Sequence, residues 1–376
     1  MKILHATADW KWTGPAEPML NAVLGLRARG HTVDVACPTA PTGYSGALAE
    51  RCRERGVEPE LLFERRRGYR PVRDRREVGR LRDKIRDGRY DLVHVHHTRD
   101  HLLVWRAMRT LDTSLVVSWH GGAPVARASL HRIRLGPRMT SGLVVLSERI
   151  AESMRRLGGA SARVVVIPGA VDTERFRPRE RSEERARELG LSPTHRVLGV
   201  VARLQPHRRF DLLLEAFALA HRAAPDLRLL VVGRGTRARK VLEEPVHSLG
   251  LEEAVVRAGY RRDDYREVLA LVDALVFLVP GSDGSCRAVL ETMSMEIPTI
   301  ASRRGILPDT VDDGETGCLV DESAEALAEA LVDVGQNPEA WAVRGKAARR
   351  RVLARHTTGA QADRLERFYR EVIGES

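Results

Sequence analysis

Two arginines five residues apart stand directly after a strand-like run, in the segment ARLQPHRRFD at 202–211. Arg203 and Arg208 would lie on a loop between a strand and a helix, where proteins usually hold phosphate groups. Guanidinium groups offer forked donors that match phosphate oxygens. The segment therefore indicates a phosphate-binding loop. The alternative is a pair of solvated arginines in an arginine-rich chain.

A second loop-to-helix segment, GSDGSCRAVLE at 281–291, follows a short apolar run that ends at Pro280. Its small residues would let a phosphate approach backbone N–H groups at a helix N-terminus, where the dipole favours an anion. Asp283 lies in the loop. Glu291 follows about two turns into the helix, among apolar neighbours where a carboxylate needs a partner. The alternative makes Asp283 a helix cap and Glu291 a solvated residue.

Strands and helices must position both loops. Segments with strand and helix patterns alternate along the sequence. Short β-branched runs alternate with longer amphipathic stretches, which indicates parallel sheets covered by helices. The predicted strands are 2–6, 32–36, 91–95, 115–118, 143–146, 164–167, 197–201, 227–232, 255–258, 274–278, 299–301 and 318–320. The predicted helices are 18–29, 78–85, 211–221, 288–295, 324–334 and the region after 341, interrupted near 356–359.

The charged segment 177–182 has no strand pattern and is typical of a connection between domains. We therefore expect two α/β domains of similar size, 1–178 and 190–356, which face each other across a cleft. In open parallel sheets, ligands bind beyond the carboxyl ends of the strands.

Composition excludes several classes of protein. The 376 residues are 43% apolar and 30% charged, which describes a globular protein and not a disordered or fibrous one. The four cysteines form no C-x-x-C pair, so a disulfide framework is not expected and a reducing compartment is. The N-terminus has no signal-peptide pattern, and no apolar run reaches the roughly 20 residues that span a bilayer. These features predict a cytoplasmic protein.

The net charge of +11 is unevenly distributed along the chain. Residues 1–178 carry 32 basic and 19 acidic side chains, whereas residues 179–376 carry 30 and 32. The densest basic stretch, 65–89, holds twelve basic and four acidic residues. Such a stretch is either a solvated helix face or a docking surface for anionic lipid. Nucleic acid is not expected as a partner, because aromatic residues are only 5% and no groove-entering motif is present.

Four histidines lie close together at 94–101, but they do not match a metal site. His94 and His96 share one face of a strand and His97 points to the other. No carboxylate pattern completes a ligand set around these residues. We predict no metal here, and no metal or other cofactor for the protein.

Taken in order and at their spacing, the segments resemble motifs of the retaining, nucleotide-sugar-dependent glycosyltransferases of family 4. The stretch 202–211 resembles the family's G-R-L-x-x-x-K-G-x-D, and Asp283 and Glu291 stand in its E-x7-E frame. Five more segments are similar to family motifs, and the resemblance covers nearly the whole chain: 13–17 (G-G-A-E), 119–121 (T-x-H-G), 167–176 (I-P-N-G-V-D-x-x-x-F), 232–235 (V-G-x-G) and 305–317 (G-x-x-P-(D/E)-x-V-x-D-G-x-x-G).

The chain departs from the family pattern at four positions. Arg208 stands where the family usually has Lys, which keeps the charge and changes its shape. Asp283 is one methylene shorter than the usual Glu, and Cys286 stands where Gly is common. Of the N-terminal glycine pair only Gly14 is present.

The resemblance implies the GT-B fold, in which two Rossmann-like domains face each other across a cleft. It also implies that residues 357–376 form a helix that returns to the N-terminal domain. The N-terminal domain would bind the acceptor and the C-terminal domain the nucleotide sugar.

Roles for single residues follow from the same resemblance. Arg203 and Arg208 would bind the donor diphosphate without a metal, Glu291 the ribose hydroxyls, and Tyr260 would lie near the base. The further residues expected at the donor are Gly14, Cys286 and Arg287.

Two residues are predicted to be catalytic. Asp283 would contact the donor sugar, and His120 would lie near the anomeric carbon and the acceptor. His96 and His97 would line the acceptor side. For His120 the alternative is a structural histidine in the core or at a cap.

These expectations predict a retaining glycosyltransferase of cell-envelope biosynthesis, acting on lipopolysaccharide, polysaccharide or a lipid-linked acceptor at the inner face of the cytoplasmic membrane. The stretch 65–89 would contact an anionic membrane surface. Two alternatives stay open: an epimerase of the GT-B fold, and a non-catalytic protein that binds sugar nucleotides.

Overall fold

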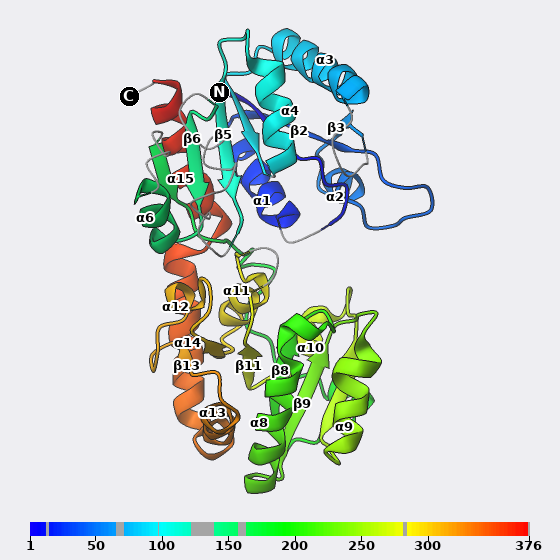
Figure 1. Ribbon diagram of the computed structural model, residues 1–376. Helices are drawn as coiled ribbons and strands as arrows, with labels where there is room; N and C mark the ends of the chain where they lie inside the picture. Colours follow the sequence, from blue (N-terminus) through cyan, green and yellow to red (C-terminus); the bar gives the residue numbers. More distant parts are fainter. Residues whose placement is uncertain are drawn as a thin grey trace. The chain divides into compact units, whose positions relative to one another are not determined.

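The structure is a computed structural model that describes residues 1–12, 15–64, 71–96, 98–121, 139–156, 163–280 and 284–374. These residues form two compact units, each built around its own sheet (Figure 1). The first unit comprises Met1–Ala170, Gly281–Ser285 and Thr358–Ser376, and the second comprises Val171–Pro280 and Cys286–Thr357.

The first unit holds a seven-stranded parallel sheet in the order β3-β2-β1-β4-β5-β6-β7. Its central strands are nearly continuous apolar runs, as expected when helices cover both faces of a parallel sheet. The strands are β1 (Lys2–Ala6), β2 (Thr32–Pro38), β3 (Pro59–Phe63), β4 (Leu92–Val95), β5 (Ser114–Trp119), β6 (Gly142–Val145) and β7 (Arg163–Val166).

The helices of the first unit include one from the far end of the sequence. They are α1 (Ala16–Arg27), α2 (Leu48–Glu54), α3 (Pro71–Gly88), α4 (Thr98–Met108), α6 (Glu148–Arg156) and α15 (Thr358–Ile373). Helix α15, coloured red in Figure 1, packs on α1 so closely that a Cβ on Gly25 would lie 2.7 Å from the Cβ of Ala362. A side chain at Gly25 would therefore push the two helices apart.

The second unit has a six-stranded parallel sheet in the order β10-β9-β8-β11-β12-β13. The strands are β8 (Arg196–Val201), β9 (Leu227–Val232), β10 (Val255–Gly259), β11 (Ala274–Phe277), β12 (Thr299–Ser302) and β13 (Gly317–Val320). The helices are α7 (Glu183–Glu188), α8 (Phe210–Ala223), α9 (Glu244–Ser248), α10 (Tyr265–Leu269), α11 (Arg287–Ser294), α12 (Leu307–Thr310), α13 (Ala324–Gln336) and α14 (Pro338–Arg355), with a short 3-10 helix η1 (Pro206–Arg208) and a π-helical turn η2 (Arg239–Glu243).

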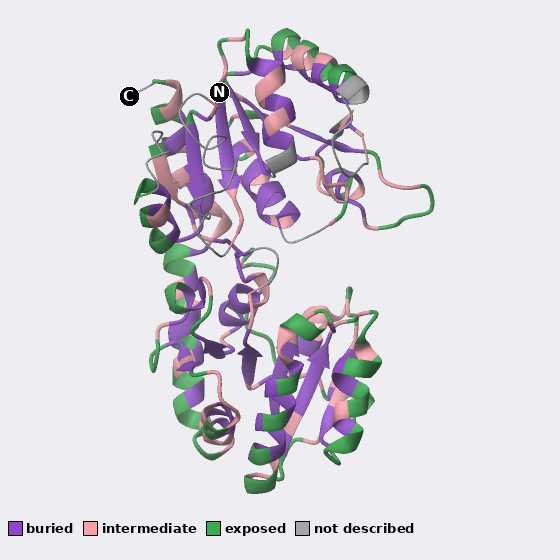
Figure 2. Ribbon diagram, viewed as in Figure 1, coloured by how far each residue is buried: buried purple, intermediate pink, exposed green. Residues whose placement is uncertain are grey.

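Burial follows the expected layering in each unit. Figure 2 shows the strands of both sheets as buried, whereas helices such as α8 and α9 carry exposed residues along one side. Among the described residues, no helix is both long enough and apolar enough to cross a membrane.

All twelve predicted strands are present, with ends that shift by one or two residues, and the two parallel sheets match the predicted fold class. One strand was not predicted. Strand β3 begins at a proline, carries the polar Glu60 and lies at the sheet edge, where these residues are tolerated and the apolar pattern is weak.

The division of the chain into units differs from the predicted boundary at 178. The first unit ends at Ala170 because the following segment is bonded to the second unit. The N–H of Val171 donates to the carbonyl of His356 (2.8 Å), and the hydroxyl of Ser294 donates to the carbonyl of Phe176 (2.6 Å). The segment Gly281–Ser285, predicted within the second domain, belongs to the first unit, and α15 begins at Thr358.

Candidate active site

The two predicted phosphate-binding arginines lie in the segment after β8 and differ in their contacts with the rest of the protein. Arg208 ends η1, and its Nη1 donates to the carbonyl of Val279 just beyond β11 (2.9 Å). Arg203 is exposed, and its guanidinium has no hydrogen bond or ion pair with any part of the chain that the structure describes. The loop therefore presents one anchored cation and one that is available to a ligand.

The turn after β9 is locked onto the same loop. Gly233 has a φ of +149°, and a Cβ there would lie 1.9 Å from the carbonyl oxygen of Ala202. The N–H of Leu204 donates to the carbonyl of Arg234 (3.2 Å). Because the two turns approach so closely, a glycine is required at 233 and the arginine loop has a fixed position.

Tyr260 follows β10 at the same edge of the sheet, since parallel strands end on one side. The residue is 58% exposed, and the Cζ of Arg234 lies 4.4 Å from the centroid of its ring. A stacked pair of this kind offers a flat, positively charged surface on which a planar ring can lie.

Glu291 is almost completely buried on α11, with 3% of its surface exposed. The hydroxyl of Tyr265 donates to one carboxylate oxygen (2.8 Å), and the Nε of Arg287 lies 3.3 Å from the other. The alternative of a solvated helix residue is therefore wrong for Glu291. Its carboxylate is held in a fixed orientation at low exposure, as a hydrogen-bonding group for a ligand would be.

Helix α11 starts with a strained residue. Cys286 precedes the helix at φ 50° and ψ 46°, in the left-handed region that favours glycine, and it is 2% exposed. This explains why glycine is common there in the family that the sequence resembles. Asp283, the second predicted catalytic residue, lies outside the described residues, as do Gly14 and His97.

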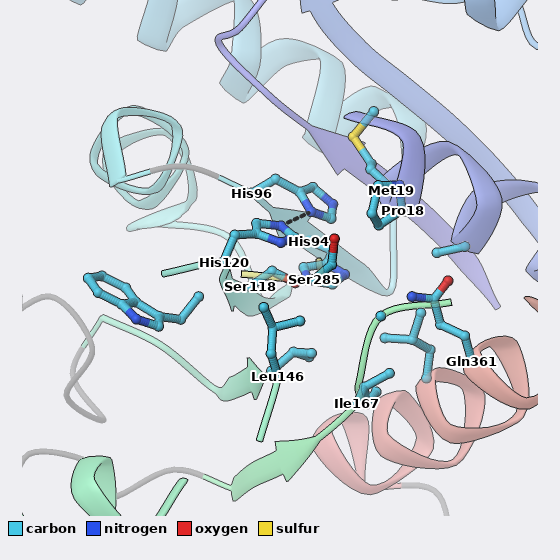
Figure 3. A pocket seen from close by; sticks show the side chains of 15 residues that line it. Pro18, Met19, His94, His96, Ser118, His120, Leu146, Ile167, Ser285 and Gln361 are labelled. Carbon is cyan, nitrogen blue, oxygen red and sulfur yellow. Dashed lines mark hydrogen bonds between the residues drawn. The ribbon is translucent and has the colours of Figure 1, made fainter. Parts of the chain in front are cut away.

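In the first unit, the loop that follows β11 reaches His120. The N–H of Gly284 donates to the carbonyl of His120 (2.8 Å), so the residue after Asp283 is bonded directly to the predicted catalytic histidine. The Nε2 of His120 lies 3.3 Å from the Nδ1 of His96, and the rings stack with centroids 5.5 Å apart. Figure 3 shows this bond as a dashed line.

His96 and His120 line a small cavity in the first unit, of about 30 Å³ (Figure 3). Ser285 and Gln361 add polar groups, and the remaining lining includes Met19, Leu146 and Ile167. A cavity of this volume holds a water molecule and is too small for a sugar ring. The structure thus brings two of the predicted residues, His96 and His120, to one place.

Two residues that sequence reasoning missed lie next to this pair. His5 on β1 stands in register with His94 on β4, and its Nδ1 is 3.0 Å from the Nε2 of His96. The hydroxyl oxygen of Tyr369, on α15, lies 2.6 Å from the Nδ1 of His94. Adjacent pairing of the two strands would have revealed His5, whereas no local signal in α15 marks Tyr369.

Burial controls the charge of this cluster. It lowers the pKa of His5 to about 3 and that of His94 well below its ordinary value, the latter with smaller effects from His5 and His120. It also raises the pKa of Tyr369. These imidazoles are therefore neutral near pH 7.

Metal binding is the alternative for this cluster, because nitrogens of His5, His94 and His96 lie within 4.8 Å of one another. Both ring nitrogens of His5 and of His94 are already bonded to protein partners. His101 takes no part, since its Nε2 contacts the carbonyl of Met139 and the hydroxyl of Thr140, each at 3.1 Å. A metal would have to displace the existing hydrogen bonds.

The basic stretch 65–89 is described from residue 71 onward, and acids neutralise several of its cations. Lys84 pairs with Glu60 (2.5 Å), and the Nε of Arg86 lies 2.8 Å from Asp87. The Nε of Arg82 donates to the carbonyl of Ala107 (3.3 Å).

Comparison with known proteins gives two matches to family models, in order along the chain. A model of Glycosyltransferase Family 4 matches residues 16–175, and a model of Glycosyl transferases group 1 matches residues 195–337.

Curated relatives carry glycosyltransferase names. The D-inositol 3-phosphate glycosyltransferase of Saccharomonospora viridis is 34% identical over 76% of this chain and 71% of its own. The GDP-mannose-dependent alpha-(1-6)-phosphatidylinositol monomannoside mannosyltransferase of Mycolicibacterium smegmatis is 32% identical over 65% of this chain and 66% of its own. In the D-inositol 3-phosphate glycosyltransferase of Mycobacterium sp. strain KMS, the aligned part is 56% of that protein.

Solved structures share the fold over the full chain. A glycosyltransferase of Rickettsia africae has a TM-score of 0.83 at 17% identity, covering 100% of this chain and 99% of that one. HepE of Anabaena, solved in complex with UDP and glucose, has a TM-score of 0.80 at 19% identity, covering 98% and 99%. Because both family models match in sequence order and a relative 34% identical aligns over 76% of this chain and 71% of its own length, the chain belongs to the family 4 glycosyltransferases of the GT-B fold, enzymes that use a nucleotide sugar.

Proposed function

We propose that this enzyme transfers a sugar, with retention of anomeric configuration, from a nucleotide sugar to a cell-envelope glycan or lipid-linked acceptor. The observation that carries the proposal is the arrangement at the carboxyl edge of the second sheet. There an available guanidinium (Arg203) and an anchored one (Arg208) lie in the segment that follows β8, and a buried, oriented carboxylate (Glu291) lies on the helix that follows β11.

In this proposal Arg203 and Arg208 bind the diphosphate of the donor and neutralise the charge that develops as it departs. Fixed positive groups stabilise such a leaving group more strongly in a site that excludes water than they do in solution. The two guanidiniums then take the place of a metal ion, so transfer proceeds in the presence of a chelator.

Glu291 would accept hydrogen bonds from the ribose hydroxyls, while the Tyr260–Arg234 pair would lie against the base. Asp283 and the backbone near Cys286 and Arg287 would contact the donor sugar and its phosphate. His120 would face the reacting carbon, as the resemblance to the family implies.

For the acceptor we propose a phosphorylated polyol or its lipid-linked form. The names of the relatives, which mention inositol 3-phosphate and a phosphatidylinositol mannoside, support this class. Transfer to a phospholipid-linked acceptor would place the enzyme in the cytoplasm, at the inner face of the membrane.

The test is a thermal-shift panel of UDP, GDP and ADP with their common sugars, followed by a transfer assay with and without EDTA. We expect one nucleotide to raise the melting temperature, and Arg203→Ala to abolish most of that rise. Arg239→Ala removes an exposed arginine of the same unit and serves as the control. NMR of the product should show the anomeric configuration of the donor. No stabilisation by any nucleotide would overturn the proposal.

A further inference from the structure

A continuous row of hydrogen bonds, four of them buried and the last partly buried, runs through the first unit and ends at His120. We call it the histidine network. Its members, in order, are Ser118, His94, Tyr369, His5, His96 and His120. The five links measure 2.8, 2.6, 3.4, 3.0 and 3.3 Å between the bonded atoms. Figure 3 shows His94, His96, Ser118 and His120 side by side at the cavity.

His94, His5 and Tyr369 each bond two neighbours in the network. His94 meets Tyr369 through Nδ1 and Ser118 through Nε2. His5 meets His96 through Nδ1 and Tyr369 through Nε2. His5, His94 and Tyr369 are at most 1% exposed, so the protein itself supplies these partners.

When all four imidazoles are neutral, this arrangement couples their tautomers. A neutral imidazole carries one N–H and one bare nitrogen, and a hydroxyl has one hydrogen to donate. If one member donates toward His120, every neighbour must donate in the same direction. If one member donated in the opposite direction, two N–H groups or two lone pairs would meet at one link. The hydrogen bond at that link would then be lost. Only two concerted states satisfy all five links.

We propose that Tyr369 is a positioning residue that sets, through the histidine network, which ring nitrogen of His120 carries the proton. In one concerted state His120 is protonated on Nδ1, and in the other on Nε2. The tautomer decides whether Nδ1 of His120 donates or accepts. The consequence for catalysis rests on the proposed function, in which His120 faces the reacting carbon.

Tyr369 is the member whose loss divides the network. Its hydroxyl joins His94 to His5, and no other described residue bridges the two rings by hydrogen bonds. Without that hydroxyl, His94 stays bonded to Ser118, while His5, His96 and His120 are separated from both of them. The helix that returns from the far end of the sequence thus determines the state of a residue in the predicted active site.

The experiment uses the full chain labelled with ¹⁵N-histidine, and two-bond ¹H–¹⁵N spectra to report the tautomer of each ring. Single His→Gln variants assign the signals. In the wild type we expect one tautomer for each of the four network histidines. In Tyr369→Phe the minor tautomer of His120 should rise roughly fivefold, the factor expected from one lost buried hydrogen bond.

Tyr90→Phe is the matched control. Tyr90 is a buried tyrosine of the same unit whose hydroxyl donates to Asp34 (2.6 Å), outside the network. It should leave the signals of His120 unchanged. If Tyr369→Phe does not fold, Ser118→Ala removes one oxygen at the other end and should shift the tautomers of His94 and His5.

Two results would overturn the inference. One is an unchanged His120 tautomer in a folded Tyr369→Phe variant. The other is binding of one equivalent of Zn²⁺ that shifts His5, His94 and His96 together in the wild type, which would make this cluster a metal site. Because the spectra need no substrate, they test the network even if no sugar transfer is found, so the two proposals fail separately.

Discussion

At the scale of the residue, burial of neutral histidine makes stability depend on pH. His5 faces His94, His96 and Tyr369, and its pKa falls from 6.5 to about 3 on folding. The unfolded chain therefore binds more protons between those values. Stability is fully present above pH 6.5 and is lost as the pH falls toward 3, by an amount on the order of 5 kcal/mol for this group.

We expect the unfolding free energy of the first unit to drop steeply between pH 6 and pH 4, and His5→Gln to make that drop shallower. Gln keeps hydrogen-bonding capacity without a titrating ring. His247→Gln changes an exposed histidine paired with Glu252 and should leave the slope as it is. Urea titrations followed by near-UV circular dichroism at each pH measure the effect, and parallel curves for wild type and His5→Gln would contradict it.

Residue identity also shows what sequence alone could reveal about the site. The sequence predicts that the carboxylate of Glu291 has a hydrogen-bond partner, because it lies among apolar helix residues. The hydroxyl of Tyr265 is that partner. The left-handed backbone at Cys286 explains why the family commonly has glycine at this position, which the sequence alone does not show. Arg209 stands at the second glycine of the family's G-R-L-x-x-x-K-G-x-D pattern. Its φ is 59°, so the backbone favours glycine at this position as well.

At the scale of the element, sequence patterns predict strands well and their partners poorly. Runs of β-branched residues mark the strands of both sheets, because a parallel strand is buried on both faces. The network around His120, however, depends on β1 pairing with β4 and on α15 packing beside α1. These are contacts between residues far apart in sequence, which no local periodicity records.

The contact between α1 and α15 gives a direct prediction. Gly25→Ala places a methyl group 2.7 Å from the Cβ of Ala362, and overpacking of this kind typically costs about 1–3 kcal/mol. Ala362→Gly in the same chain removes the opposing methyl group and should restore most of the lost stability. Chemical denaturation of the two single variants and the double variant measures the coupling. Additive effects would show that the two helices do not meet as described.

At the scale of the whole molecule, the first 178 residues carry 32 basic and 19 acidic side chains, and α3 contributes seven of the basic and four of the acidic ones. Ion pairs occupy Lys84 and Arg86, which weakens the sequence-based expectation for those side chains. Arg75 and Arg76 are different. Both are exposed, and neither has a hydrogen bond or ion pair with another described residue. Contact with an anionic surface would therefore concentrate at the beginning of α3.

We expect sedimentation with phosphatidylglycerol-containing vesicles to rise with anionic lipid content and to fall with salt, because exposed cations near such a surface each contribute about 1 kcal/mol. Replacing Arg75 and Arg76 together with glutamate should weaken this binding by roughly tenfold or more. Arg239 and Lys240, an exposed adjacent pair in the second unit, give a double reversal with the same change in net charge. Equal losses for both double variants would assign binding to net charge alone, and binding that ignores lipid charge and salt would leave the basic stretch without a role at the membrane.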